Sequence, residues 1–98
     1  MVYEVRWTEN AFEDLREIVI YLEREWSLKV SYEFLDKCFL NIELISNFPY
    51  LGSQSEKEVD IRKILITKQI VLFYRVDKNI ITLLNLFDTR QDPEKSKF

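Results

Sequence analysis

The first residues of the chain alternate between apolar and charged side chains. Tyr3, Val5 and Trp7 occupy every second position, with a charged residue between each pair. Because successive side chains of a strand point to opposite faces, this period of two predicts a half-buried strand over residues 2–7.

Directly after this strand, the apolar positions recur at steps of three and four residues. Such steps place side chains on one face of a helix, so we predict an amphipathic helix of about four turns. Thr8 is the expected N-cap, and Glu9 is favourably placed beside the helix N-terminus. The apolar positions of this helix are Ala11, Phe12, Leu15, Ile18, Val19, Leu22 and Trp26.

A second stripe with helical spacing predicts another helix, which either Ser27 or Ser31 can cap. Pro49 ends this helix, because proline cannot continue the backbone hydrogen-bond ladder. Only a few residues separate the two helices, so we expect an antiparallel hairpin. The stripe contains Phe34, Leu35, Cys38, Ile42 and Ile45 and ends near Phe48.

Three apolar runs rich in β-branched residues fill the second half of the chain, at residues 61–67, 69–76 and 80–87. The separators between them are short enough for hairpins, so we predict three strands here. The polar residues 53–60 before these runs are interpreted as a solvated loop. The whole order predicts an α+β fold, β-α-α-β-β-β, with a helical hairpin packed on a largely antiparallel four-stranded sheet.

The middle run is almost continuously hydrophobic from Ile70 to Tyr74. A strand with this pattern is either covered on both faces or exposed on one face to a protein partner, and both interpretations stay open. At 98 residues the chain is expected to form one domain, 1–98, in which residues 88–98 are a polar C-terminal tail.

Composition narrows the class of protein. Hydrophobic residues make up 47% of the chain and aromatic residues 14%, which is enough for a packed interior. The N-terminus lacks the layout of a signal peptide, and no apolar run approaches the roughly 20 residues of a membrane span. We therefore expect a cytoplasmic protein with no membrane partner. The single Cys38 cannot form an internal disulfide, and its place on the apolar stripe predicts a buried, inert thiol.

The net charge of −3 is unevenly distributed. Residues 1–48 contain ten acidic and five basic side chains, whereas residues 49–98 contain seven acidic and nine basic ones. This asymmetry fits two surfaces with different partners, or an ordinary solvated surface. The overall negative charge argues against nucleic-acid binding by charge alone, because such binding depends on clustered Lys and Arg.

Standard catalytic and metal-binding constellations are absent from the sequence. Without any His, neither a Ser-His-Asp triad nor a Cys-His pair can form. One Cys argues against a zinc site, and one Gly excludes a glycine-rich phosphate loop. We expect no metal and no cofactor. General acid–base catalysis would fall to Asp, Glu, Lys or Tyr, and spacing singles out none of them.

The order of several short segments nevertheless resembles a known family, the toxins of the RelE/ParE superfamily, over residues 2–93. Arg62 opens the second predicted strand, Tyr74-Arg75 ends the third, and an Arg-containing tail follows the fourth. The first half of the chain also resembles the family, at the end of its first strand and at the residues that end its second helix. The segments that carry the resemblance are Trp7-Thr8, Asn47-Phe48-Pro49-Tyr50-Leu51-Gly52, Arg62-Lys63, Tyr74-Arg75-Val76-Asp77 and Asp88-Thr89-Arg90-Gln91-Asp92-Pro93.

The resemblance implies a toxin of a type II toxin–antitoxin system, and the superfamily divides by activity. RelE-like members cut messenger RNA on the ribosome, whereas ParE-like members lack most of the catalytic side chains, and several poison DNA gyrase. Val71 stands where RelE-like toxins carry an Arg, and Asp88 and Pro93 stand where their tails place His or Tyr. Because Val cannot stabilise a developing phosphorane charge and Pro cannot transfer a proton, the ParE-like branch is favoured.

Three functions stay open. The leading one is a toxin, neutralised by a cognate antitoxin, that inhibits growth by binding a target without enzymatic activity, with DNA gyrase the first candidate. The second is a ribosome-dependent messenger RNA interferase that uses Arg62, Lys63, Arg75 and Arg90. The third is a non-toxic interaction protein of the same fold. A homodimer and a toxin–antitoxin hetero-oligomer are both compatible with the sequence.

The predicted target contacts, Arg62, Lys63 and Arg90, each have a structural alternative. Arg90 can form an ion pair with Asp88 or Asp92, a common and individually weak surface contact. Arg62 and Lys63 can be charges that protect an edge strand from aggregation.

Aromatic and apolar residues divide between the core and a possible interface. Tyr74 is expected in the core with its hydroxyl hydrogen-bonded, and Trp7 and Trp26 are also expected in the core. Side chains that fall outside the second stripe are better candidates for a protein interface. In the RelE/ParE family an antitoxin segment usually wraps the toxin against such surface. The interface candidates are Tyr32, Leu40, Leu44 and Tyr50.

Overall fold

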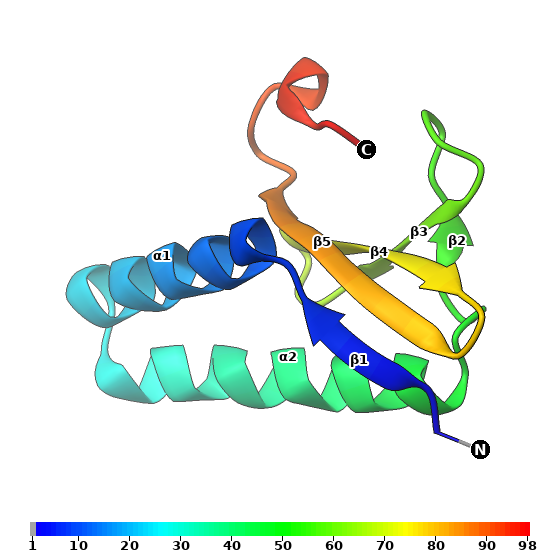
Figure 1. The fold of residues 1–98 in the computed structure, drawn as a ribbon. Helices are drawn as coiled ribbons and strands as arrows, with labels where there is room; N and C mark the ends of the chain where they lie inside the picture. The colour runs from blue at the N-terminus through cyan, green and yellow to red at the C-terminus, as the bar shows by residue number, and fades with distance from the viewer. Residues whose placement is uncertain (1) are drawn as a thin grey trace.

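A computed structural model describes residues 2–98, so residue 1 of the predicted domain lies outside the described residues. Two helices form a hairpin that packs on one face of a five-stranded sheet (Figure 1). The elements are β1 (Glu4–Trp7), α1 (Glu9–Glu25), α2 (Leu28–Asn47), β2 (Ser53–Gln54), β3 (Ile61–Leu65), β4 (Ile70–Asp77), β5 (Ile80–Asp88) and the 3-10 helix η1 (Pro93–Lys95).

The strands lie in the order β1-β5-β4-β3-β2. β1 runs parallel to β5, and the other neighbouring pairs are antiparallel. The predicted α+β fold, with a helical hairpin on a largely antiparallel sheet, is confirmed. The predicted count of four strands is wrong, because Ser53–Gln54, inside the expected loop 53–60, pairs with β3. A polar strand of two residues has no apolar alternation, so the sequence carries no signal for it.

The helix caps explain where the hairpin begins and turns. Thr8 caps α1 as predicted, since its Oγ1 accepts a hydrogen bond from an N–H of the first turn at 3.0 Å. The same hydroxyl donates to the carbonyl of Leu83 at 2.8 Å, which ties the start of α1 to β5. Of the two candidate caps for α2, Ser27 is the one that acts, because its Oγ accepts a hydrogen bond from the Val30 N–H at 3.1 Å. Ser31 is instead buried inside the first turn of the helix.

The two tryptophans occupy different environments. Trp7 is half-buried, and the centre of its ring lies 6.4 Å from the centre of the Phe39 ring. Trp26 is 70% exposed, so the prediction that it belongs to the core is wrong. Its φ of −122° and ψ of −88° place it just outside α1, where the helical period no longer applies. Phe12, at the margin of the same stripe, is also exposed.

The main core lies between the helical hairpin and the sheet. Cys38 is buried in it, as predicted, and burial raises the pKa of its thiol to about 11. A thiol with so high a pKa stays protonated and unreactive at neutral pH. The fully buried core residues are Ala11, Cys38, Ile45, Leu72, Tyr74, Ile81 and Leu83.

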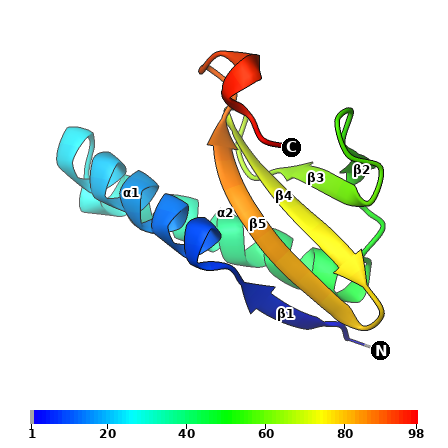
Figure 2. The same ribbon diagram turned by 45° about the horizontal axis from the view of Figure 1, so that its top comes forward.

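A smaller apolar cluster covers the opposite face of the sheet. Ile61, Val71 and Phe73 point away from the helices, and Phe98 from the end of the chain packs over them. The centres of the Phe98 and Phe73 rings are 5.9 Å apart. Figure 2 shows the C-terminal segment returning over the sheet from the end of β5. The continuous hydrophobic run 70–74 is therefore buried on both faces, which confirms the first of its two interpretations.

Candidate binding surfaces

A groove of about 560 Å³ opens between α1, α2 and the adjoining ends of β4 and β5. Its floor is apolar and continues the main core, with Ile18 and Leu22 from α1, Phe34 from α2 and Leu86 from β5. The rim is polar and is formed by the strand ends and by charged residues of both helices. A hollow of this size has the volume of a typical ligand pocket.

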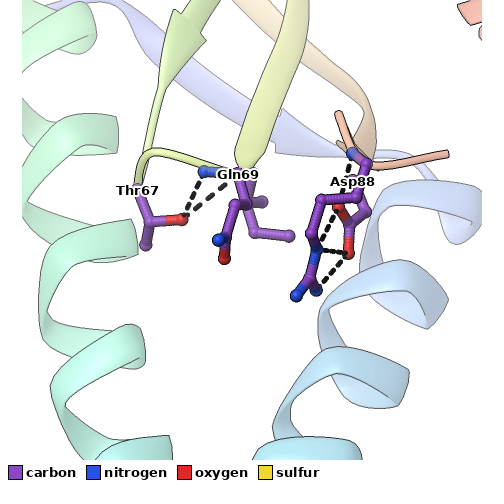
Figure 3. Close-up of polar contacts among 5 residues, drawn as sticks. Thr67, Gln69 and Asp88 are labelled. Atoms are coloured by element: carbon purple, nitrogen blue, oxygen red, sulfur yellow. Dashed lines mark hydrogen bonds and ion pairs between the residues drawn. The ribbon is translucent and has the colours of Figure 1, made fainter.

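One part of the rim is an ion pair between Asp88, the last residue of β5, and Arg90 (Figure 3). Arg90 Nη2 lies 2.6 Å from Asp88 Oδ2, and the Arg90 backbone N–H donates to Asp88 Oδ1 at 2.9 Å. The side-chain hydrogen bond from Arg90 lowers the pKa of Asp88. The ion pair predicted as the alternative role of Arg90 is thus present, with Asp88 rather than Asp92. The Arg90 side chain is still 58% exposed at the rim.

The turn between β3 and β4 forms the neighbouring part of the rim. Thr67 Oγ1 accepts hydrogen bonds from the backbone N–H groups of Gln69 and Ile70, each at 3.2 Å. The carbonyl of Gln69 accepts a further bond from the Thr89 N–H at 2.7 Å, which ties the turn to the tail. The Gln69 side chain points into the space between the helices (Figure 3). No sequence pattern pointed to this residue, because the polarity of a turn residue does not indicate where its side chain points.

Carboxylates from both helices give the groove a negative rim. Asp14 and Glu17 line it from α1 and Glu33 lines it from α2, opposed by Lys37. Asp14 Oδ2 also accepts a hydrogen bond from the Leu86 N–H at 3.1 Å, and burial raises the pKa of this carboxyl. The groove therefore favours an apolar ligand with positive charge over a phosphate.

At the β2 edge of the sheet, Arg62 and Tyr74 hold the link between α2 and β2. Arg62 Nη1 donates to the Gly52 carbonyl at 2.7 Å, and its guanidinium lies 4.9 Å from the centre of the Tyr50 ring. The Tyr74 hydroxyl donates to the Pro49 carbonyl at 2.8 Å and accepts from the Gly52 N–H at 2.9 Å. Tyr74 is completely buried, so its prediction as a hydrogen-bonded core residue is confirmed.

The interpretation of Arg62 and Lys63 as charges on an edge strand is wrong. Both lie opposite β2, with Gln54 paired to Arg62 and Ser53 paired to Lys63. The backbone hydrogen bonds that an edge charge would protect are therefore already taken by another strand. Arg62 instead anchors a link, and Lys63 lies on the sheet face away from the helices.

The four cationic residues considered for a ribonuclease lie on three different surfaces. Lys63 and Arg75 share the sheet face away from the helices, where Arg75 Nε lies 3.3 Å from Asp60 Oδ2. Arg62 turns to the link after α2, and Arg90 lies at the rim of the groove. No site in the described part of the chain brings all four together.

The interface candidates on α2 and its following link are exposed. Tyr32, Leu40, Leu44 and Tyr50 are 57%, 59%, 40% and 63% exposed. The structure adds Phe48, 63% exposed, which the sequence placed at the end of the core stripe. Four-residue spacing puts Leu40 and Leu44 on one side of the helix, and Phe48 follows at its C-cap. We name these three residues the α2 apolar strip.

Within residues 2–98, no three His, Cys, Asp or Glu side chains are grouped closely enough to hold a metal ion. Over the same residues, neither helix combines the length and hydrophobicity of a transmembrane span.

Comparison with known proteins connects this arrangement to a protein family. The sequence model of the family described as "ParE toxin of type II toxin-antitoxin system, parDE" matches residues 5–93. No curated protein matches the chain.

Several solved structures share the fold at low sequence identity. The chromosomal ParDE toxin–antitoxin system from P. aeruginosa aligns with a TM-score of 0.75 and 16% identity, over 89% of this chain and 96% of that one. The toxin–antitoxin complex RelBE2 from Mycobacterium tuberculosis aligns with a TM-score of 0.60 and 18% identity, over 90% and 99%. The YoeB/ParE toxin from Agrobacterium tumefaciens aligns with a TM-score of 0.66 and 14% identity, over 87% and 96%.

Proposed function

Because the chain belongs to the ParE toxin family of type II toxin–antitoxin systems, we propose that it arrests growth by binding a cellular target. A cognate antitoxin neutralises it by covering part of its surface. DNA gyrase is the first candidate target, and the proposal places the action in the cytoplasm. The toxin acts by occupying its target rather than by breaking a covalent bond.

The observation that supports action by binding is the separation of the cationic side chains. Cleavage of RNA needs groups around one phosphate that stabilise developing charge and transfer protons. Here the Arg62 side chain points to the opposite sheet face from Lys63 and Arg75, and Arg90 lies at the rim of the groove. Val71, at the position where a ribonuclease of this fold would need a cation, is only 7% exposed in the cluster under Phe98.

Among the predicted target contacts, Arg90 is the best placed to bind a target. It is largely exposed, and Asp88 holds Nε and Nη2 while Nη1 makes no hydrogen bond to residues 2–98. A side chain already held in one orientation loses less conformational entropy when it binds. Lys63 offers a second contact on another surface, and Arg62 is partly committed to the link after α2.

The antitoxin is proposed to cover the exposed apolar residues of α2. The proteins that share this fold include the ParDE system and the RelBE2 complex, each of which is described with its antitoxin. The α2 apolar strip, Tyr32 and Tyr50 are large apolar or aromatic side chains that α2 and its following link leave exposed, and contiguous exposed apolar surface is typical of protein interfaces. A toxin–antitoxin hetero-oligomer is therefore the proposed resting form.

A supercoiling assay with purified gyrase tests the proposed target. We expect inhibition that increases with the concentration of the protein, and about tenfold weaker inhibition by Arg90→Ala. Arg16→Ala is the matched control, because Arg16 is also 58% exposed and also forms an ion pair. Normal supercoiling at saturating protein, together with growth arrest in cells, would exclude gyrase as the target but would leave the toxin function standing. Harmless expression of the chain would favour a non-toxic interaction protein.

Messenger RNA cleavage is the alternative function. The observation that favours it is that Lys63 and Arg75 lie on the same sheet face, opposite Phe73 and Ile61 respectively. Two cations there could contact one phosphate backbone, although Arg75 is paired with Asp60. Cleavage would then depend on Lys63 and Arg75 and be independent of Arg90.

A further inference from the structure

β1 is the longer of the two edge strands of the sheet, and its outer side is open. The strand order β1-β5-β4-β3-β2 leaves β1 and β2 at the edges, and β2 has only two residues. In Figure 2, β1 lies at the margin of the sheet with no other strand along its outer side. An open edge strand presents backbone N–H and C=O groups with which another strand can pair.

The backbone hydrogen bonds of β1 show which residues face outward. Glu4 and Thr8 donate their N–H groups to carbonyls of the β5 hairpin at 2.9 and 3.2 Å. Because successive residues of a strand direct their N–H and C=O groups to opposite sides, Val5 and Trp7 present theirs to the open edge. Tyr3 faces the same way, although its N–H already donates to a carbonyl of α2 at 2.8 Å.

The residues along this edge are complementary to themselves. From Tyr3 to Trp7 they are aromatic, acidic, aliphatic, basic and aromatic. In an antiparallel pair centred on Val5, a second copy sets its Arg6 opposite Glu4 and its Trp7 opposite Tyr3. Opposite charges and aromatic rings are both favourable cross-strand pairs.

Charge also selects the register of such a pair. A centre moved to Glu4 or to Arg6 would place two like charges directly opposite each other, which is unfavourable. With the centre at Val5, each Val5 exchanges both backbone hydrogen bonds with its counterpart. Glu4 then lies in a non-hydrogen-bonded pair with Arg6 of the second copy, the arrangement in which side chains come closest.

Both faces of the edge leave side chains available for this contact. Glu4 and Arg6 form an ion pair with each other within one chain, yet their side chains are still 59% and 60% exposed. On the helix side, Trp7 is half-buried beside Phe39, whose side chain is 52% exposed. Strand pairing would thus be flanked by charge pairs on one face and by aromatic surface on the other.

We infer that the chain, when free of antitoxin, dimerises through β1, with the two strands antiparallel and centred on Val5. The pairing joins the two sheets into one continuous sheet and removes its longer open edge. The inference goes beyond the proposed function and does not depend on the identity of the cellular target.

Sedimentation equilibrium of the full chain, purified free of antitoxin, tests the inference. The unaltered chain should form a dimer, and Glu4→Arg and Arg6→Glu should each weaken self-association about tenfold, because like charges then face each other. An equimolar mixture of the two variants should restore the dimer, since every charge of one chain then meets an opposite charge of the other. The ion pair within one chain cannot produce this rescue.

The ion pair of Glu13 and Arg16 on α1 provides the matched control, because its side chains are 50% and 58% exposed. Glu13→Arg and Arg16→Glu make the same charge changes away from β1. Each should change self-association less than about twofold, and their mixture should associate no more tightly than the unaltered chain. This result would separate a specific contact from attraction between oppositely charged chains.

A backbone variant tests the pairing independently of charge. Val5→Pro removes the outward N–H, and proline is tolerated in an edge strand at such a position. It should weaken self-association at least about tenfold, because the central hydrogen bonds of the pair are lost. Circular dichroism melts establish that each variant is folded, and the charge variants carry the test if Val5→Pro is not.

Three results would overturn the inference. The first is an unaltered chain that stays monomeric at every concentration measured. The second is a dimer that the edge variants do not weaken, or that their mixture does not restore, because the interface then lies elsewhere. The third is a monomeric chain whose binding to a co-expressed antitoxin is weakened by the edge variants, which would assign the edge to that partner.

Discussion

At the scale of single residues, Gly52 and Tyr74 form the tightest contact of the link after α2. A Cβ at Gly52 would lie 2.5 Å from the Tyr74 hydroxyl oxygen and 2.7 Å from the Lys63 carbonyl. Gly52 does not have a positive φ, so space rather than backbone conformation requires glycine here. Its hydrogen bond to Tyr74 closes the link onto the sheet.

Gly52→Ala is therefore expected to lower the free energy of unfolding by about 2 kcal/mol, because the added methyl forces Tyr74 and β3 apart. Tyr74→Phe is expected to cost about 1–3 kcal/mol, since it leaves the Pro49 carbonyl and the Gly52 N–H without their buried partner. Urea denaturation of both single variants and of the double variant measures these changes. The double variant should cost less than the two single variants together, because removing the hydroxyl relieves part of the clash. Simple additivity would contradict this contact.

Asp88 makes stability depend on pH in a defined direction. Its pKa in the folded chain lies below the ordinary value of 3.8, chiefly because of the hydrogen bond from Arg90. A lowered folded-state pKa adds stability that is present above the unfolded-state value and is lost as the pH falls through the folded-state value. Asp88→Asn should therefore lower the melting temperature at neutral pH, and the difference should shrink below pH 3.8. A difference that grows in acid would contradict this assignment.

At the scale of elements, apolar periodicity predicted both helices and β1, because each of them keeps one face hydrophobic. The apolar runs rich in β-branched residues predicted β3, β4 and β5. β2 escaped prediction since it contributes backbone pairing and no apolar side chain. Trp26 was placed in the core because the periodicity continues one residue beyond the end of α1. Helix ends depend on local backbone geometry, which the spacing of apolar residues does not report.

The C-terminal tail is the element whose role differs most from its polar composition. Phe98, its last residue, completes the apolar cluster with Ile61, Val71 and Phe73. One aromatic residue at the end of a polar segment has no periodicity, so the sequence alone did not connect it to the sheet. The continuous hydrophobic run of β4 is the corresponding signal, because a strand buried on both faces requires a cover on each.

Deleting residues 93–98 should lower the free energy of unfolding by about 1–2 kcal/mol, because the apolar face of β4 becomes exposed to water. The deletion should also create binding of a fluorescent dye that recognises apolar surface. Phe98→Ala is expected to reproduce most of both effects, and Lys97→Ala, which removes an exposed neighbour, is the matched control. Unchanged stability and no dye binding would show that the tail does not hold this face.

At the scale of the whole molecule, the uneven charge of the sequence corresponds to separate surfaces. The acidic first half forms the helical hairpin and the negative rim of the groove, whereas Lys63, Arg75 and Arg90 come from the second half. Exposed apolar residues on α2 were predictable, because they fall outside its core stripe. The groove was not, because α1, α2 and the strand ends meet only in three dimensions.

The chain belongs to the ParE toxin family. The separation of its cationic side chains over different surfaces favours binding to a target over RNA cleavage. The most direct test is primer extension on messenger RNA from translating ribosomes while the expressed chain arrests growth. The account predicts arrest without codon-phased cleavage, even at saturating protein. Codon-phased cleavage that disappears in Lys63→Ala or Arg75→Ala, with growth arrest lost in parallel, would contradict it.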